Sequence, residues 1–525
     1  MKLEPLQIWS EYQKISDYLT SKRIYETVKQ NEKFYDGNQW DGIKADNMPK
    51  PVFNFIQRNT KYMVATLSSN DIGISITPFS PNEDDIQKFK PIAEEVEKVI
   101  ERGKIKESAK LAIRNGCVDG SAYMMQMFDA DYETGQEMKG RIVNKLIHNT
   151  NMYFGNPYSN DIQEQPYIIV AMRQHVEQVK QEAELLGVKE DDIDLIKADD
   201  NSTQTNDDSQ DLCTVLIKYF KKITKKEDGT KTKTVWFTKT TQNVTLIEPI
   251  ELGYKRYPIS CFGWDPVHNS YTYNSPITSI IPNQIFINKC FAIAQVYGIQ
   301  SAFPKVVYDK NKVQIEEFLE GTSPHAVASL DMAGKFLDFI KIPDFSSHIL
   351  ELVNQTIEHT KECMGVTNAA LGNVNPDNTS AIIALQEASN VPLELQRQNY
   401  FEFWEDTVRN IIDIMANTYG ERQVIAEDLE GNKTIATIDF SLLKNVNFEI
   451  NVDIGNASQF SEIAQMNTLD KLVMNGMIDS KLYIDSIPSK YIPNKGKIAQ
   501  HVDQVAKQMA QQNQMALQSQ NLPIQ

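Results

Sequence analysis

Apolar residues recur at helical spacing over the first stretch of the chain, residues 6–35. Most stand three or four positions apart, at Ile8, Tyr12, Ile15, Tyr18, Leu19, Tyr25 and Val28. A period near 3.6 residues predicts a helix with one buried face. The same criterion predicts helices near 53–67, 84–101 and 105–115. Alternating or continuous apolar residues predict strands at 72–76 and 122–128.

The next segment, up to residue 239, has the pattern of short strands around a single helix. We predict strands at 139–147, 166–172, 212–223 and 233–239, and a helix at 177–186. The last two strands flank a turn at 227–229 and are rich in lysine. Such a hairpin either protects an exposed sheet edge or contacts nucleic acid, and we favour edge protection.

The character of the chain changes at Pro276. Residues 276–297 predict a nearly continuous helix that is apolar on more than one side, with Lys289 as its charged residue. A helix of this kind must be covered by neighbours, either in a core or against copies of itself in a ring. A second helix is predicted at 347–364, and strands at 305–308 and 336–340 lie between the two.

A loop rich in Gly and Asn follows, at 365–380, and carries Asp377 as its one charge. It leads to a long predicted helix, 381–419, in which Pro392 should cause a kink. Strands are expected within 422–454 and helical pieces near 462–475 and 480–486. The last helix begins near Lys497 and ends in a glutamine-rich tail.

Composition and charge narrow the classes of protein that fit. With 41% hydrophobic residues over 525 positions, the chain has the composition of a folded globular protein and is long enough for roughly two to four domains. Its formal charge of −17 excludes tight, general DNA binding but permits a protein along which DNA slides without sticking. No apolar run is long enough for a membrane helix, and the acidic start predicts no signal peptide. We therefore expect assembly in the cytoplasm.

No motif of known catalytic chemistry is present in the sequence. The chain lacks a phosphate-binding loop, GxGxxG, GxSxG and HExxH, and its five cysteines form no CxxC pair. The acidic clusters between 189 and 210 have almost no apolar residues around them, as expected of a solvated loop rather than a metal site. We expect no catalytic residue, cofactor or metal ion.

Three motifs in a fixed order resemble the portal (head-to-tail connector) proteins of tailed bacteriophages, especially those of short-tailed phages. They are FYDGNQW at 34–40 followed by PVFN at 51–54, then NPYSND at 156–161, then YNSP at 273–276 with Gln284 and Asn288. The order of elements is similar from about residue 10 to 500. Each motif is weak alone, and their order carries the resemblance.

The resemblance implies an α+β, ring-forming portal fold with wing, stem, clip and crown regions. The wing would comprise 1–275 and 381–455, and the stem helices 276–298 and 346–365. The clip would be 299–345, the tunnel loop 366–380, and the crown with its glutamine-rich tail 456–525. Some relatives carry a long C-terminal helical barrel, which the polar tail here puts in doubt.

The resemblance also implies a function. It would be a dodecameric ring at one capsid vertex, through which the double-stranded DNA genome is packaged and ejected. The implied partners are the terminase large subunit, a head-completion or tail adaptor protein, and the major capsid and scaffolding proteins; no membrane is involved. The alternatives are a cytoplasmic scaffold or adaptor, or an enzyme without a recognisable motif.

Three sets of residues are candidates for functional roles in such a ring. Stem packing is assigned to Ile280, Ile285, Phe286 and Phe291. The clip surface is assigned to Lys305, Tyr308, Lys310 and Lys312. The tunnel loop offers small or amide side chains that hydrogen-bond phosphates without trapping them, at Thr367, Asn368, Asn373, Asn375, Asn378 and Thr379. The alternative for this loop is a simple surface connector.

Overall fold

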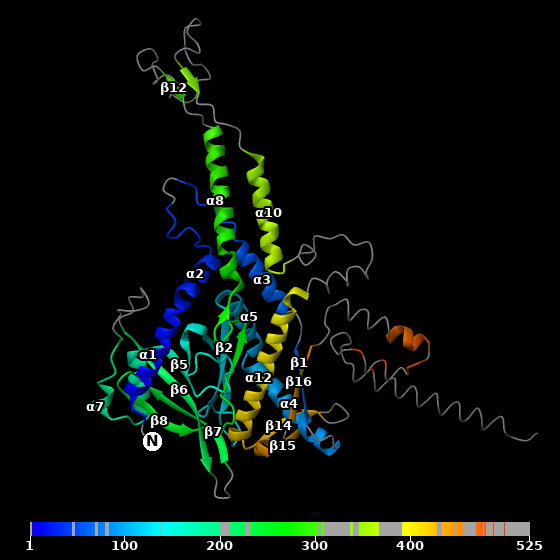
Figure 1. Ribbon diagram of the computed structural model, residues 1–525. Helices are drawn as coiled ribbons and strands as arrows, with labels where there is room; N and C mark the ends of the chain where they lie inside the picture. Colours follow the sequence, from blue (N-terminus) through cyan, green and yellow to red (C-terminus); the bar gives the residue numbers. More distant parts are fainter. Residues whose placement is uncertain are drawn as a thin grey trace, which may run out of the picture.

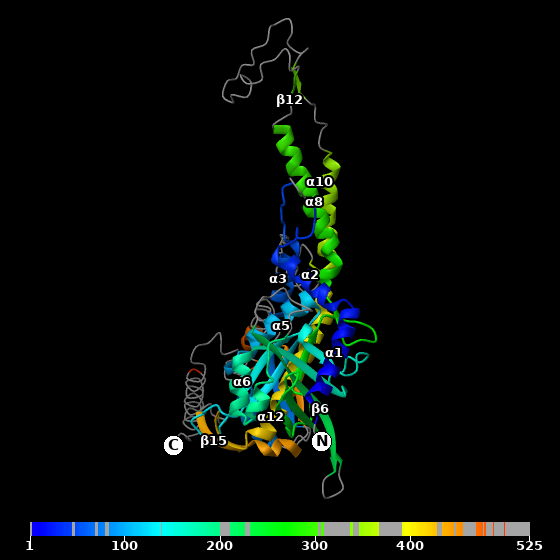
Figure 2. The ribbon, with the colours of Figure 1, turned by 90° about the vertical axis from the view of Figure 1, so that its left-hand side faces the viewer.

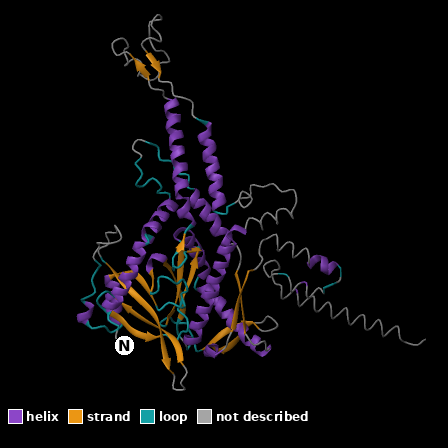
Figure 3. Ribbon diagram, in the orientation of Figure 1, coloured by secondary structure: helices purple, strands orange, loops and turns teal. Residues whose placement is uncertain are grey.

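The chain folds into a body of helices and sheets from which one pair of helices projects (Figures 1 and 2). The computed structural model describes residues 3–44, 48–68, 72–78, 83–137, 139–199, 211–225, 231–302, 306–308, 337–339, 346–366, 391–427, 433–445, 448–454, 469–475, 477–478, 483, 487 and 498. Helices and antiparallel strands are both abundant (Figure 3), which confirms the predicted α+β class.

The longer helices lie close to their predicted positions. They are α1 (Pro5–Ser21), α2 (Ile24–Asp36), α3 (Phe55–Ser68), α4 (Glu83–Arg102), α5 (Ile105–Asp119), α6 (Val176–Leu185), α7 (Glu190–Ile193), α8 (Pro276–Ala302), α10 (Ser347–Cys363) and α12 (Glu394–Thr418). The single helix expected over 6–35 is two, because Arg23 takes a left-handed φ of 57° between α1 and α2. The expected kink at Pro392 is a short 3₁₀ turn, Val391–Leu393, that precedes α12.

The larger sheets lie in the body. One has the order β4-β5-β6-β7-β8, from strands Met152–Phe154, Tyr167–His175, Leu212–Lys225, Lys231–Thr240 and Thr245–Glu251. Another has the order β3-β2-β9, from Arg141–His148, Ser121–Asp129 and Ile259–Gly263. All pairings in these two sheets are antiparallel.

Among the described residues, four further pairs of strands form short ribbons. They are β1 (Ile72–Pro78) with β16 (Phe448–Ile454), β10 (Asp265–Pro266) with β11 (Tyr273–Asn274), β12 (Val306–Tyr308) with β13 (Leu337–Phe339), and β14 (Glu421–Glu427) with β15 (Lys433–Asp439). The β1–β16 ribbon joins residues that are far apart in the sequence. The β12–β13 ribbon lies beyond the far end of α8 (Figure 1).

The main core lies where α5 and α12 pack with β2 and β9. Trp404 and Phe403 on α12 and Phe262 on β9 are at most 1% exposed. Gly116 on α5 permits this close contact, since a Cβ there would stand 2.5 Å from the Phe262 ring. The Ser260 and Thr407 hydroxyls, 2.7 Å apart, add a buried hydrogen bond between β9 and α12.

The lysine-rich hairpin, β6–β7, is in the middle of its sheet. Edge protection is therefore the wrong explanation where β5 and β8 flank it. Several of the lysines are held within the chain instead. Lys218 is 5% exposed and pairs with Glu11, and Lys239 pairs with both oxygens of Glu182 at 2.5 and 2.6 Å. Burial lowers the pKa of Lys221 to about 8, and its ammonium lies over the Tyr257 ring.

Gly120, which ends α5, is a position where only glycine fits. Its φ is +94°, and a Cβ would stand 2.2 Å from the Tyr273 carbonyl oxygen. We predict that Gly120→Ala lowers the free energy of unfolding by at least about 2 kcal/mol, measured by chemical denaturation. Gly135→Ala is the control, with φ of +75° and open space, and should cost about 1 kcal/mol. Equal costs would contradict the proposed clash.

Candidate functional site: the base of the projecting helices

Helix α8 has two environments along its length. Its first turns are seated in the main core, where Ile277, Ile280 and Ile281 are at most 4% exposed. Its later turns leave the body beside α10 (Figures 1 and 2). There the two helices share a small cluster of Ile287, Cys290 and Val353. The projecting pair is therefore anchored at one end and has only a thin core of its own.

Large apolar side chains remain exposed on the projecting pair. On α8, Ile293 is 47% and Ile299 58% exposed, and on α10, Leu350 is 45% and Leu352 50% exposed. Scattered exposed apolar residues are ordinary on a protein surface. Here they occur on both helices of one thin projection. The two helices therefore carry apolar surface that no other described residue covers.

Buried amides join the base of α8 to the N-terminal part of the chain. Gln39, Gln284 and Asn288 are each at most 2% exposed. The Asn288 amide donates to Gln39 Oε1 at 2.6 Å, and the Gln284 amide donates to Asn288 Oδ1 at 3.1 Å and to the Phe53 carbonyl at 2.7 Å. We call these three residues the amide network. Each of these hydrogen bonds is strong because water is excluded. Removing one partner would leave a buried polar group unbonded and would destabilise the fold.

The motif asparagine Asn54 extends this arrangement to α2 and α3. Its amide donates to the Tyr35 carbonyl at 2.8 Å, and its Oδ1 accepts from the Gln39 amide and from the Gln57 backbone N–H. The motif tryptophan Trp40 donates to the Pro51 carbonyl at 2.8 Å. The first and third motifs of the sequence thus meet in space, and their polar residues hold the turn at 37–40 against α8.

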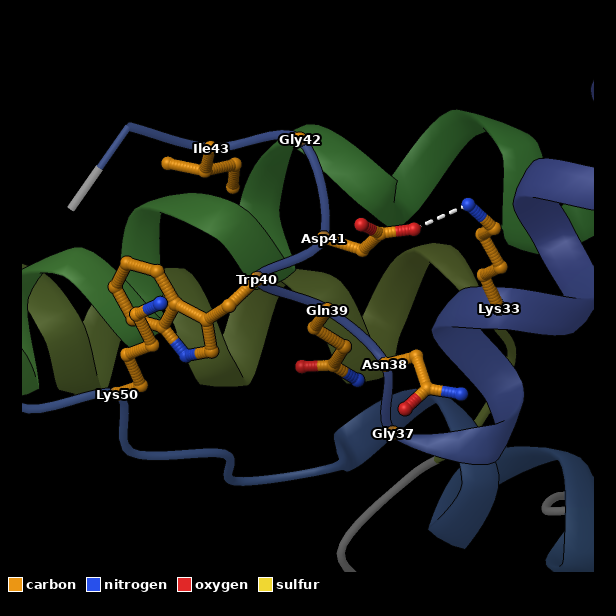
Figure 4. Close-up of a pocket in the computed structure, with 9 residues that line it drawn as sticks. All are labelled: Lys33, Gly37, Asn38, Gln39, Trp40, Asp41, Gly42, Ile43 and Lys50. Carbon is orange, nitrogen blue, oxygen red and sulfur yellow. Dashed lines mark hydrogen bonds and ion pairs between the residues drawn. The ribbon is translucent and has the colours of Figure 1, made fainter. Parts of the chain in front are cut away.

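A cavity of about 590 Å³ opens beside this turn (Figure 4). Trp40 and the paired side chains of Lys33 and Asp41 line it, and Lys50 lies near the Trp40 ring (Figure 4). The lining offers two lysines and one aromatic face but no arrangement for acid–base or nucleophilic chemistry.

The second motif, at 156–161, is a loop held by one buried side chain. Gln165 is 3% exposed, its Oε1 accepts from the Asn156 backbone N–H at 2.8 Å, and its amide donates to the Ser159 carbonyl at 2.8 Å. Asp161 accepts from the Gln163 backbone N–H at 2.7 Å. Asn156 and Asp161 therefore serve as local turn residues.

A charged cluster that the sequence did not predict lies between α2, α5 and the end of β3. Both terminal nitrogens of the Arg114 guanidinium donate to the carboxylate of Glu32, one to each oxygen. His148 lies 3.1 Å from Asp119 Oδ2, and the Asp119 side chain is fully buried. Glu32, Asp119 and His148 could offer atoms to a metal ion. The Arg114 charge beside them already supplies a cation, so we interpret the cluster as an ion-pair network.

Burial and the Arg114 charge shift the pKa values of the two carboxyl groups of this cluster in opposite directions. It raises the pKa of Asp119 to about 6, although the hydrogen bond from His148 acts in the opposite direction. Burial also acts to raise the pKa of Glu32, but the hydrogen bonds and charge of Arg114 outweigh it and leave that pKa lowered. The two carboxyl groups are close together, so the pair takes up a proton more readily than two isolated acids do.

The predicted site residues fall into two groups. Ile280 is buried in the main core, whereas Ile285, Phe286 and Phe291 are half-buried, and Phe291 contacts Phe53 with ring centroids 4.2 Å apart. Tyr308 lies in β12. The others lie outside the described residues; they are Lys305, Lys310, Lys312, Thr367, Asn368, Asn373, Asn375, Asn378 and Thr379.

Comparison with models of known protein families assigns the chain to one family. The model for the phage P22-like portal proteins matches residues 11–525, and the chain belongs to this family. The resemblance inferred from the three motifs is thereby confirmed. Membership identifies a phage portal protein, and hence a component of the phage particle.

No curated protein matches the chain. A solved structure titled "Virion of native gene transfer agent (GTA) particle" is similar with a TM-score of 0.40 and 10% identity, over 87% of this chain and 91% of that chain. In the described ranges, no helix has the length and apolar character needed to cross a membrane.

The amide network gives a direct test of how α8 is anchored. We predict that Asn288→Ala lowers the free energy of unfolding by about 2–3 kcal/mol, because it removes the partner of the buried Gln39 Oε1 and one of the two acceptors of the Gln284 amide. Asn283→Ala on the same helix is the matched control. Asn283 makes a single half-buried bond to Thr360, at 3.1 Å, and its loss should cost about 1 kcal/mol or less. If the amide network did not stabilise the fold, Asn288→Ala and Asn283→Ala would lower the free energy of unfolding by the same amount.

The raised pKa of Asp119 leads us to predict that the free energy of unfolding depends on pH. Its pKa of about 6 in the folded chain exceeds its ordinary 3.8, so the folded state binds the proton more tightly than the unfolded state. The stabilisation of the folded state by this proton is fully present below the ordinary pKa of 3.8, and it is lost as the pH rises through about 6. Asp119→Asn cannot titrate. Its stability relative to wild type should therefore rise between about pH 4.5 and 7 in thermal unfolding; a constant difference would refute the assignment.

Proposed function

We propose that the protein forms a dodecameric ring at one vertex of a phage capsid and is the channel through which the DNA genome enters and leaves. Family membership supplies the class of protein. The observation that carries the proposal for this chain is the projecting pair, α8 and α10, with large apolar residues exposed on both helices. In a ring each pair would have a neighbour on either side, and these residues would be covered.

The proposed regions follow the element order. The body would be the wing, from 1–275 and 381–455, and the projecting pair the stem, within 276–298 and 346–365. The clip, 299–345, would include the β12–β13 ribbon. The loop at 366–380 would line the tunnel, and 456–525 would form the crown. In support, the chain leaves α8 and returns in α10 at the same end of the projection (Figure 1).

Charge supports a channel through which DNA moves freely. Twelve copies with a formal charge of −17 each would carry −204. A surface of net negative charge does not condense onto phosphates, so DNA could be driven past it without a deep energy well. Two lysines of the β6–β7 hairpin, Lys218 and Lys239, are paired with carboxylates of the chain, which leaves fewer cations to bind DNA.

The proposed partners follow from the position of the ring in a capsid. The clip would dock the terminase large subunit during packaging and a head-completion or tail adaptor protein afterwards. The wing would face the major capsid and scaffolding proteins. The ring would assemble in the host cytoplasm and remain in the virion.

Oligomeric state tests this function most economically. Native mass spectrometry or negative-stain imaging should give rings of about 720 kDa, from twelve copies of 59.8 kDa. We predict that the double variant Leu350→Lys, Leu352→Lys shifts the chain to smaller species, because buried ammonium groups destabilise the interface. Leu185→Lys on α6, at a residue 89% exposed, is the control and should leave the ring unchanged. A monomeric wild-type chain would contradict the proposal.

The proposed tunnel loop gives a second test. Changing Asn373 and Asn375 to Lys would add up to 24 positive charges to a twelve-fold gate. Rings should assemble normally, while DNA packaging slows or stalls, more severely at low salt because screening is weaker. The measurement is packaged DNA length in an in vitro packaging reaction at several salt concentrations. Wild-type packaging at every salt concentration would show that the loop does not face DNA.

A further inference from the structure

A second cavity, of about 630 Å³, lies in the body between α4, β3, the loop at 132–136 and β14. It is distinct from the cavity beside Trp40 and shares no lining residue with it. Its size is within the range of 300–1,000 Å³ that is usual for small-molecule sites. Nothing in the portal function requires a polar cavity at this place.

The charged residues that line this cavity are mostly cations. They are Lys98, Arg102, Arg141 and Arg422, against the carboxylates of Glu95 and Glu133, which gives a formal surplus of two positive charges. The whole chain, by contrast, carries −17. Glu95 is shared by Arg102 at 3.4 Å and Lys98 at 3.7 Å. Burial raises the pKa of Glu95, so the positive surplus persists or grows when this group is protonated.

Arg422 is the most buried of these cations, at 9% exposure. Its guanidinium donates to the carbonyls of Tyr419, Gly140 and Lys139 at 3.2, 3.0 and 2.8 Å, and it lies 3.8 Å from the Tyr419 ring centroid. No carboxylate of the described residues forms an ion pair with it within 4.0 Å. A guanidinium has five N–H groups, so three carbonyl contacts do not exhaust its donors.

Asn144 supplies a second, independent observation. It lines the same cavity from β3, and both its Oδ1 and its Nδ2 are buried without a hydrogen-bond partner in the part of the chain that the structure describes. Buried amides are nearly always bonded. Two unsatisfied amide atoms on a residue that lines the same cavity as a buried cation indicate that something polar completes the site.

We propose that this cavity binds a small molecule bearing an oxyanion, with Arg422 and Arg102 contacting the anionic group and Asn144 bonding a polar group beside it. Arginine and an amide are the groups that recognise carboxylate and phosphoryl oxygens. The cavity is larger than a lone phosphate ion needs, so the ligand is a molecule of about nucleotide size. Carboxylate and phosphoryl groups share this chemistry, and two probes separate them.

Isothermal titration calorimetry on the full-length protein tests the proposal with AMP, citrate and uncharged adenosine. We expect AMP or citrate to bind with a dissociation constant at or below about 1 mM, more weakly as salt is raised, and adenosine to bind at least about tenfold more weakly. The anion that binds assigns the ligand as phosphorylated or carboxylic. No heat from either anion, or equal binding of AMP and adenosine, would overturn the proposal.

Variants localise the binding. Asn144→Asp is nearly isosteric and adds a negative charge, so it should weaken anion binding by about tenfold or more. Arg102→Gln changes a side chain that is 72% exposed, keeps the fold testable and should also weaken binding. Arg23→Gln, at a residue 81% exposed outside the cavity, is the matched control and should leave affinity unchanged. If Arg102→Gln and Arg23→Gln act alike, the anion binds elsewhere.

Discussion

The structure depends on how the apolar helix α8 is held at its base while its upper part leaves the body. Three buried amides, Gln39, Gln284 and Asn288, bond one another and the backbone at Phe53. Apolar packing alone is non-directional and would allow α8 to rotate or slide. Directional hydrogen bonds in a dry interior fix one position, because every shift leaves a polar group unsatisfied. The helix pair can then present its exposed faces at a defined angle.

This constraint also explains the sequence motifs. Residues 34–40, 51–54 and 284–288 are far apart along the chain and meet at the base of α8. Their glutamines and asparagines hold the base of α8, and in the proposed ring the exposed leucines and isoleucines above them would be covered by a neighbouring copy. The half-buried charges of Glu32 and Arg114 and the buried Asp119 add a proton-sensitive contact between α2 and α5, on the side of the body from which Asn31 bonds Thr278 of α8.

The local pattern of apolar residues predicted most helices and strands. Contacts between segments far apart in the sequence could not be predicted from it. The apolar period placed α4, α5, α8 and α10 within a few residues, because a helix records its buried face in its own sequence. The pairing of β1 with β16 and the inner position of β6 and β7 could not be read in this way, since strand order depends on residues far apart. The oxyanion cavity left no local signal either, because its residues come from four separate segments.

The central claim is that the exposed apolar residues of α8 and α10 are covered by neighbouring copies. Oxidative footprinting of the full-length protein, read by mass spectrometry, measures solvent access at each side chain. In a single chain Ile293 and Leu352 are 47% and 50% exposed, and Leu185 on α6 is 89% exposed. The account predicts strong protection of Ile293 and Leu352 in the assembled protein, with Leu185 still oxidised. Oxidation of all three in proportion to these exposures would contradict it.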